Sequence, residues 1–184
     1  MQKEIERKHN NVYYSIFTIA NIHLSIASIN GGLAIIEFNQ GEEEFLNTLN
    51  RYFPTFKLVM DDEKNSDYIN QITEYFQGNR TEFTCPIHFI GTDFQVKVWK
   101  ALMEIPYGET ASYKEIAEKI GNPKAMRAVG MANNKNKLPI VVPCHRIIGA
   151  NGKLVGYGGG LHIKEMLLKL EGINIIGDKV ASNE

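Results

Sequence analysis

The residue of this sequence best suited to covalent chemistry is Cys144, in the run Pro143-Cys144-His145-Arg146. A cysteine reacts as its thiolate, and a neighbouring histidine or positive charge lowers the thiol pKa. The apolar run 138–142 comes directly before it, so a buried, inert thiol is the alternative. The two residues that follow favour a reactive cysteine with a histidine base.

Two further features could complete such a site. Glu171 lies near the end of an expected helix over 161–172, where an acid opposes the helix dipole and therefore needs a partner. Cys144, a bridging water, His145 and Glu171 would then be nucleophile, base and orienting group. The glycine-rich segment 156–160 suits a flexible wall over a flat ligand.

The other cysteine, Cys85, belongs to no recognisable catalytic or metal-binding motif. It forms neither a C-x-x-C pair nor a metal-ligand spacing with Cys144. We interpret it as a small buried thiol. A disulfide between the two cysteines is the alternative, although a reducing, cytoplasmic setting fits better.

The first half of the chain must supply a scaffold. Segments 12–19, 22–29 and 33–38 are rich in β-branched residues, and Asn30-Gly31-Gly32 is a hairpin turn between the last two. Helices are expected over 42–53 and 64–76. Residues 1–88 therefore predict a small α/β domain with a short antiparallel sheet, joined by 84–91 to the second half.

The second half is mostly helical. Thr92-x-x-Gln95 and Ser112-x-x-Glu115 are capping boxes that open helices, the second over 113–120. Another helix is expected over 123–133, with Asn122 as its N-cap. The pair resembles a helix-turn-helix, although such pairs are common without DNA.

Charge separates the two halves. Residues 1–90 carry 7 basic and 12 acidic side chains, whereas residues 91–184 carry 13 and 9. The second half would attract a polyanion, although a solvated basic face is the plain alternative. The helix over 123–133 carries small residues (Ala125, Ala128, Gly130 and Ala132) around one cation, Arg127. It therefore favours minor-groove binding with little sequence readout, or else tight helix packing.

Length and hydropathy bound the remaining classes. The 184 residues, 43% hydrophobic and 22% charged, suit a globular chain with one large or two small domains. No apolar run reaches the roughly 18 residues of a membrane span. The charged segment 1–10 lacks an apolar export signal, so we expect a cytoplasmic protein that binds no membrane.

Several motifs together resemble the O6-alkylguanine-DNA alkyltransferases, also called methylated-DNA–protein-cysteine methyltransferases. The active-site signature is similar over 140–149. The segments 107–113 and 121–130 are similar to the part before the helix-turn-helix and to the recognition helix. Asn136, the segment 156–161, Lys164 and the segment 167–172 follow in family order and spacing, so the resemblance covers about 90–172.

The resemblance implies an α+β fold. An RNase H-like domain over 1–88 would precede a winged helix-turn-helix domain over 89–172, and 173–184 would form a C-terminal tail. From their polar character alone, residues 178–184 are expected to be frayed. It also implies DNA repair by stoichiometric transfer of the alkyl group from O6-alkylguanine, and from O4-alkylthymine, to Cys144. The partner would be double-stranded DNA containing the damaged base, bound by a monomer or cooperatively.

The resemblance also assigns residue roles. The base is flipped out of the duplex and Arg127 fills its space. His145 acts as base through water, Glu171 orients it, Tyr113 protonates the leaving guanine, and Asn136 braces the active-site turn. The residues expected to contact DNA or the damaged base are Arg127, Ala128, Arg146, Ile147, Tyr157, Gly158, Gly159 and Lys164.

Two departures from the family pattern matter. Gly158 replaces a hydroxyl residue of some relatives, which leaves room for larger alkyl groups. Residues 1–88 hold only Cys85, His9, His23 and His88, so we expect neither zinc nor another cofactor. The alternatives are an alkyltransferase-like protein that binds alkylguanine without repairing it, which the presence of Cys144 disfavours, and a winged-helix regulator with a redox-sensing cysteine.

Overall fold

The computed structural model describes residues 10–181 and divides into two compact units. The first contains the chain up to Asn70 together with Cys85–His88, and the second contains Gln71–Thr84 and everything from Phe89 onward. The chain passes from the first unit to the second within helix α2 (Ser66–Phe76), and it returns to the first unit only for Cys85–His88.

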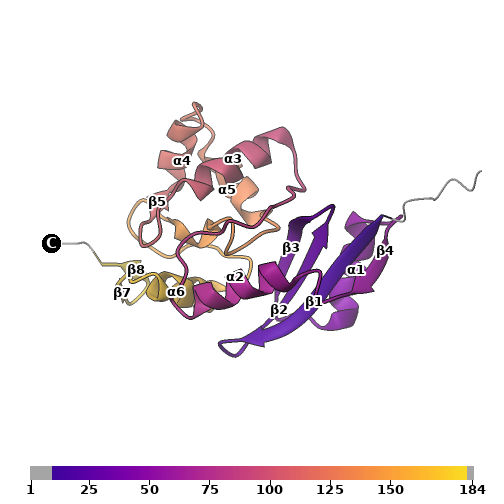
Figure 1. Cartoon of the computed structure of the whole chain (residues 1–184). Helices are drawn as coiled ribbons and strands as arrows, with labels where there is room; N and C mark the ends of the chain where they lie inside the picture. Colours follow the sequence, from indigo (N-terminus) through magenta and orange to yellow (C-terminus); the bar gives the residue numbers. More distant parts are fainter. Residues whose placement is uncertain (1–9, 182–184) are drawn as a thin grey trace, which may run out of the picture. The chain divides into compact units, whose positions relative to one another are not determined.

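A four-stranded sheet forms the first unit, in the order β3-β2-β1-β4 (Figure 1). Strands β1 (Asn11–Ile19), β2 (Ile22–Ile29) and β3 (Gly32–Phe38) are antiparallel, as predicted. The prediction lacked β4 (Lys57–Met60), which pairs in parallel with β1. Its four residues are too few to show the alternation that identifies a strand.

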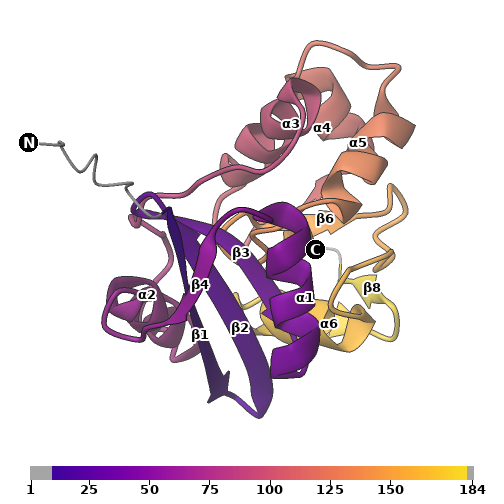
Figure 2. The ribbon, with the colours of Figure 1, turned by 90° about the vertical axis from the view of Figure 1, so that its right-hand side faces the viewer.

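Each face of this sheet has its own cover. Helix α1 (Glu42–Tyr52) lies against one face (Figure 2), where Tyr14 contacts Phe45 and donates a hydrogen bond to Glu42. On the other face Asn65, just before α2, hydrogen-bonds to Ser15 and Ser28 of neighbouring strands. These buried polar groups satisfy one another, so the unit keeps a closed core.

Helices dominate the second unit. Both predicted capping boxes are confirmed, at the start of α3 (Asp93–Met103) and of α4 (Tyr113–Lys119). The start predicted for the next helix was wrong, because α5 (Met126–Asn134) begins after Ala125 without a side-chain cap. Asn122 instead accepts a backbone hydrogen bond from Ala125, so residues 122–125 form a turn.

The rest of the second unit surrounds the predicted site. Cys144–Arg146 form the short 3₁₀ helix η1, followed by β6 (Ile147–Ile148), which pairs in parallel with β5 (Ala111–Ser112). Helix α6 spans Leu161–Leu170. No helix within residues 10–181 combines the length and apolar character needed to cross a membrane.

The end of the described chain is more regular than expected. Strands β7 (Ile175–Ile176) and β8 (Lys179–Val180) form a small antiparallel hairpin. Asp178 pairs with Lys153 at 2.9 Å, and its carbonyl accepts a hydrogen bond from Leu154. The expectation that 178–184 would be frayed is therefore wrong for residues 178–181. Residues 182–184, like His9, lie outside the described range.

Candidate active site

Cys144 lies at the start of η1 and is only 5% exposed. Asn136 holds it from the end of α5, because its Nδ2 donates to Cys144 Sγ at 3.1 Å and to the Val142 carbonyl at 3.0 Å. The Oδ1 of the same amide accepts from Leu138 N at 2.9 Å. One side chain thus fixes both the thiol and the apolar run that leads to it.

The backbone of that apolar run is strained. Ile140 is buried and has a φ of 76°, a conformation that β-branched residues rarely adopt. Such strain costs about 1–3 kcal/mol and persists only where surrounding contacts enforce it. The Asn136 bonds on either side of Ile140 are contacts of that kind.

The environment of the thiol differs from the sequence prediction. Burial raises the pKa of Cys144 to about 11, although the Asn136 hydrogen bond, Lys164 and the Tyr157 hydroxyl oppose this shift. The expectation that its neighbours in the sequence would lower the thiol pKa was wrong. The free thiolate is therefore scarce, and a base must take the proton during the reaction.

His145 is completely buried, and its Nε2 lies 2.7 Å from Oε1 of Glu171. Burial lowers the pKa of His145, so the imidazole is neutral. Because an ionised carboxylate can only accept, the ring proton lies on Nε2 and Nδ1 keeps its lone pair. Nδ1 is buried and makes no hydrogen bond within the described residues, which leaves it available to accept a proton.

Glu171 has the partner that its position required. Arg146 binds it through two parallel hydrogen bonds, from Nε at 2.8 Å and from Nη2 at 2.9 Å. Burial would raise the pKa of Glu171, but the hydrogen bonds from His145 and Arg146 outweigh it and hold the value at about 2. Glu171 therefore stays ionised beside His145.

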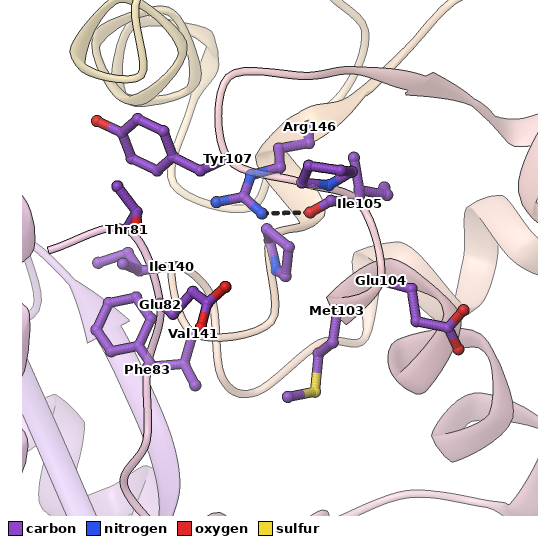
Figure 3. A pocket seen from close by; sticks show the side chains of 12 residues that line it. Thr81, Glu82, Phe83, Met103, Glu104, Ile105, Tyr107, Ile140, Val141 and Arg146 are labelled. Carbon is purple, nitrogen blue, oxygen red and sulfur yellow. Dashed lines mark hydrogen bonds between the residues drawn. The ribbon is translucent and has the colours of Figure 1, made fainter.

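The Arg146 side chain is buried, and each of its three nitrogens donates a hydrogen bond within the protein. Its Nη1 donates to the Ile105 carbonyl at 2.6 Å, and the guanidinium lies beside the Tyr107 ring (Figure 3). The side chain is buried at the edge of a pocket of about 390 Å³. This placement favours a structural role for Arg146 over the DNA contact expected from the sequence.

Lys164 is also turned inward. It is fully buried, and its Nζ donates to the carbonyls of Ile147 and Val155. Burial lowers its pKa to about 8, while the nearby Cys144 opposes this shift. Lys164 thus ties α6 to the strand after η1 and to the loop before the glycine-rich segment.

Sequence reasoning missed one member of this cluster, Tyr75 of α2. Its hydroxyl donates to Glu171 Oε1 at 2.6 Å and lies 3.4 Å from His145 Nε2. The side chain is fully buried. A tyrosine separated from its partners by 70 and 96 residues leaves no spacing signal in a single sequence.

Tyr113 and Arg127 meet outside the buried cluster. With Met126, Gly130 and neighbouring residues they line an apolar hollow of about 300 Å³. Burial and the proximity of Cys144 raise the pKa of Tyr113, so its hydroxyl keeps its proton. At Gly158 the glycine-rich loop is open, because an added Cβ would meet nothing within 4 Å.

The exposed face of helix α5 carries fewer small side chains than its composition suggested. Ala132 is buried, and its carbonyl accepts a hydrogen bond from Trp99, so it cannot face a duplex. Met131, one turn after Arg127, is instead 69% exposed. Small residues near Arg127 remain accessible at Ala128 and Gly130.

Comparison with known protein families covers nearly the whole chain. Residues 12–89 match the ribonuclease-like domain of 6-O-methylguanine DNA methyltransferase, and residues 93–173 match the DNA-binding domain of the same family. The two matches follow one another in the order that the sequence predicted.

Individual relatives agree with these matches. The inducible methylated-DNA–protein-cysteine methyltransferase of Bacillus subtilis is 44% identical over 91% of this chain and 94% of its own length. The Methanosarcina acetivorans methyltransferase is 47% identical over 88% and 99%.

Solved structures share the fold. The O6-methylguanine methyltransferase of Mycobacterium tuberculosis superimposes with a TM-score of 0.74 at 42% identity, over 87% of this chain and 92% of that one. The M. tuberculosis OGT in complex with DNA gives 0.76 at 43% identity, over 86% and 92%. Both domains, in order and over nearly their full length, are therefore shared, and the chain belongs to the 6-O-methylguanine DNA methyltransferase family.

Proposed function

We propose that this chain binds DNA and repairs O6-methylguanine by moving the methyl group onto Cys144, once per molecule. One observation carries the assignment of the acceptor. Cys144 Sγ is held by Asn136, next to a neutral His145 whose Nε2 is bound by Glu171. A nucleophile, a base and an orienting acid in one buried cluster are the parts that alkyl transfer to a thiol requires.

Activation of the thiol begins at His145. Its Nδ1 takes the Cys144 proton through a bridging water, and Glu171 stabilises the imidazolium that forms. The sulfur then attacks the alkyl carbon, so the S–C bond forms while the bond from that carbon to guanine O6 breaks. The product is a thioether, which has no simple route back to the thiol.

The guanine anion needs a proton as it leaves. Tyr113 supplies it to a ring nitrogen, and the proton accepted by His145 restores the Tyr113 hydroxyl. This role is supported by the hollow that Tyr113 shares with Arg127 and by the proximity of Tyr113 to the thiol. The damaged base would stack beside Tyr157, with the backbone at Cys144, Ile147 and Gly159 reading its edge.

The DNA is double-stranded and is bound through its minor groove by α5. Arg127 enters the stack in place of the flipped nucleotide, and Ala128 allows the backbone to approach. Because the side chains of Arg146 and Lys164 are buried and hydrogen-bonded within the protein, we assign them to bracing the site instead of to contacting DNA.

The remaining expectations complete the proposal. Residues 1–88 act as the support domain, 89–172 carry DNA binding and chemistry, and the C-terminal segment from 173 contains the β7–β8 hairpin. The protein acts as a monomer, or cooperatively along DNA, in the cytoplasm, a setting consistent with Cys85 and Cys144 not being joined by a disulfide. O4-alkylthymine would be a second substrate, and Gly158 would admit alkyl groups larger than methyl.

Loss of the lesion from DNA tests the function. A duplex oligonucleotide containing O6-methylguanine is incubated with excess protein, and its nucleosides are then quantified. We expect the lesion to become guanine with the wild type and with Cys85→Ala, and to persist with Cys144→Ala. Binding without any loss of the lesion would instead support the non-repairing alternative.

A further inference from the structure

The carboxylate of Glu171 is surrounded by five donors. Oε1 accepts from His145, from Tyr75 at 2.6 Å and from Arg146 Nη2. Oε2 accepts from Arg146 Nε and from the Gly108 amide at 3.3 Å. Arg146 neutralises the charge, so the Tyr75 bond is not needed to keep Glu171 ionised.

Tyr75 binds the same oxygen as the catalytic imidazole. Its hydroxyl is 2.6 Å from Glu171 Oε1, whereas His145 Nε2 is 2.7 Å from that atom. Two donors on one oxygen share its charge density, so each weakens the bond that the other makes. Tyr75 is thus able to change how strongly Glu171 stabilises a positive charge on His145.

Three other charged groups that face His145 shift its pKa, and they do so in opposite directions. Glu171 at the end of α6 favours the imidazolium, whereas Arg146 on η1 and Lys164 on α6 oppose it. Tyr75 belongs to α2. Burial together with the charge of Glu171 raises the pKa of its hydroxyl well above the ordinary value. Its hydroxyl is therefore a permanent donor and never a second base.

We propose that Tyr75 is a positioning residue of the alkyl-transfer site: by donating to Glu171 Oε1 it lowers the charge density that this oxygen offers to His145, and so it favours the neutral form of the imidazole. The proposal rests on the function assigned above to Cys144 and His145. The Tyr75 hydroxyl binds Glu171 Oε1 at 2.6 Å and reaches His145 Nε2 only at 3.4 Å, so its main route to the imidazole is through Glu171.

The variant Tyr75→Phe separates this role from simple packing. Phenylalanine keeps the ring in contact with Phe83 and Tyr107 and removes one donor, while Glu171 Oε1 retains two. The unshared charge then stabilises the imidazolium better, so the pKa of His145 should rise. We expect a rise of about 0.5–1 pH unit, a fraction of a charged hydrogen bond.

Tyr107→Phe is the matched control. Tyr107 lies in the same aromatic cluster, but its hydroxyl donates to the Leu170 carbonyl at 2.9 Å and leaves the carboxylate alone. It should reproduce any packing effect of losing a buried hydroxyl without changing the charge on Glu171.

The test has two readouts. NMR titration of the His145 ring nitrogens measures its pKa without any methyl transfer, and the pH profile of lesion repair measures the consequence. In Tyr75→Phe we expect the imidazole pKa and the acid limb of the profile to rise together, with no loss of rate on the plateau. Tyr107→Phe should match the wild type in both.

Two results would overturn the proposal. One is an unchanged His145 titration in Tyr75→Phe, and the other is a rate loss of equal size at every pH, which a structural role predicts. If wild-type protein repaired nothing, the proposed function would fail, whereas the NMR titration would still decide whether Tyr75 tunes His145.

Discussion

At the scale of single residues, burial keeps the Cys144 thiol in its protonated, unreactive form. With a pKa of about 11, roughly one thiol in 10⁴ is ionised at pH 7. Burial therefore prevents casual oxidation and alkylation, and reactivity depends on the neutral His145 next to it. The thiolate therefore forms only during the reaction and is not present beforehand in the resting site.

This dependence predicts the behaviour of His145→Gln. The amide can still donate to Glu171, but no base remains, so repair at pH 7 should slow by about 10²–10⁴-fold. As the pH rises toward the thiol pKa of about 11, hydroxide replaces the base and the deficit should shrink. Single-turnover repair rates between pH 6 and 10 check this. A deficit that is constant across pH would contradict the role of His145 as base.

Replacing Asn136 should lower both the stability of the protein and its repair rate. Asn136→Ala removes hydrogen bonds to Cys144 Sγ, the Val142 carbonyl and the Leu138 amide, and it releases the strained turn at Ile140. We expect the free energy of unfolding to fall by about 1–3 kcal/mol and repair to slow. Chemical denaturation measures the first effect. Unchanged stability would show that the amide does not brace the turn.

At the scale of elements, the proposed DNA contact lies on α5, and replacing Arg127 tests it. Arg127→Ala should slow repair of duplex DNA far more than transfer from a free alkylated base, because a free base needs no replacement in the stack. Parallel rate measurements with duplex and with free O6-benzylguanine check this. Lys169→Ala, which removes an exposed cation paired with Glu165 on α6, is the control. Equal losses on both substrates would refute base replacement.

The elements also show where sequence reasoning succeeds. The capping boxes at Thr92 and Ser112 are local, since three residues determine each one, and both were predicted correctly. The start of α5 was misplaced because Pro123 suits a turn as well as a first helical turn. Strand β4 depends on pairing with β1, more than forty residues away, and its own residues give no signal.

The candidate site likewise has some features that the sequence predicts and others that it does not. An acid at a helix end predicted that Glu171 would have a partner, and the structure provides that partner in Arg146. The direction of the Arg146 side chain was not predictable, because neighbours in sequence share no necessary contact. Tyr75 and the raised thiol pKa arise from burial and from distant segments, which a single sequence does not report.

At the scale of the whole molecule, the Glu171 cluster links repair to acid stability. The pKa of Glu171 is about 2 in the folded chain, below its ordinary value of 4.5. Its contribution, on the order of 3 kcal/mol, is therefore complete above pH 4.5 and is lost as the pH falls toward 2.

Denaturation across pH 5 to 2.5 tests that link. Glu171→Gln should be less stable at pH 5 and should lose less stability on acidification than the wild type. Glu118→Gln, which alters an exposed ion pair with Lys114, should follow the wild type. Identical pH slopes for Glu171→Gln and the wild type would contradict the depressed pKa.

The central claim is that Cys144 itself receives the alkyl group and is consumed. Peptide mass mapping after reaction with excess O6-methylguanine duplex tests it directly. The account predicts one added methylene per chain, located on Cys144, with the yield never exceeding one lesion repaired per protein molecule. Methyl on Cys85, or continued repair without modified protein, would contradict it.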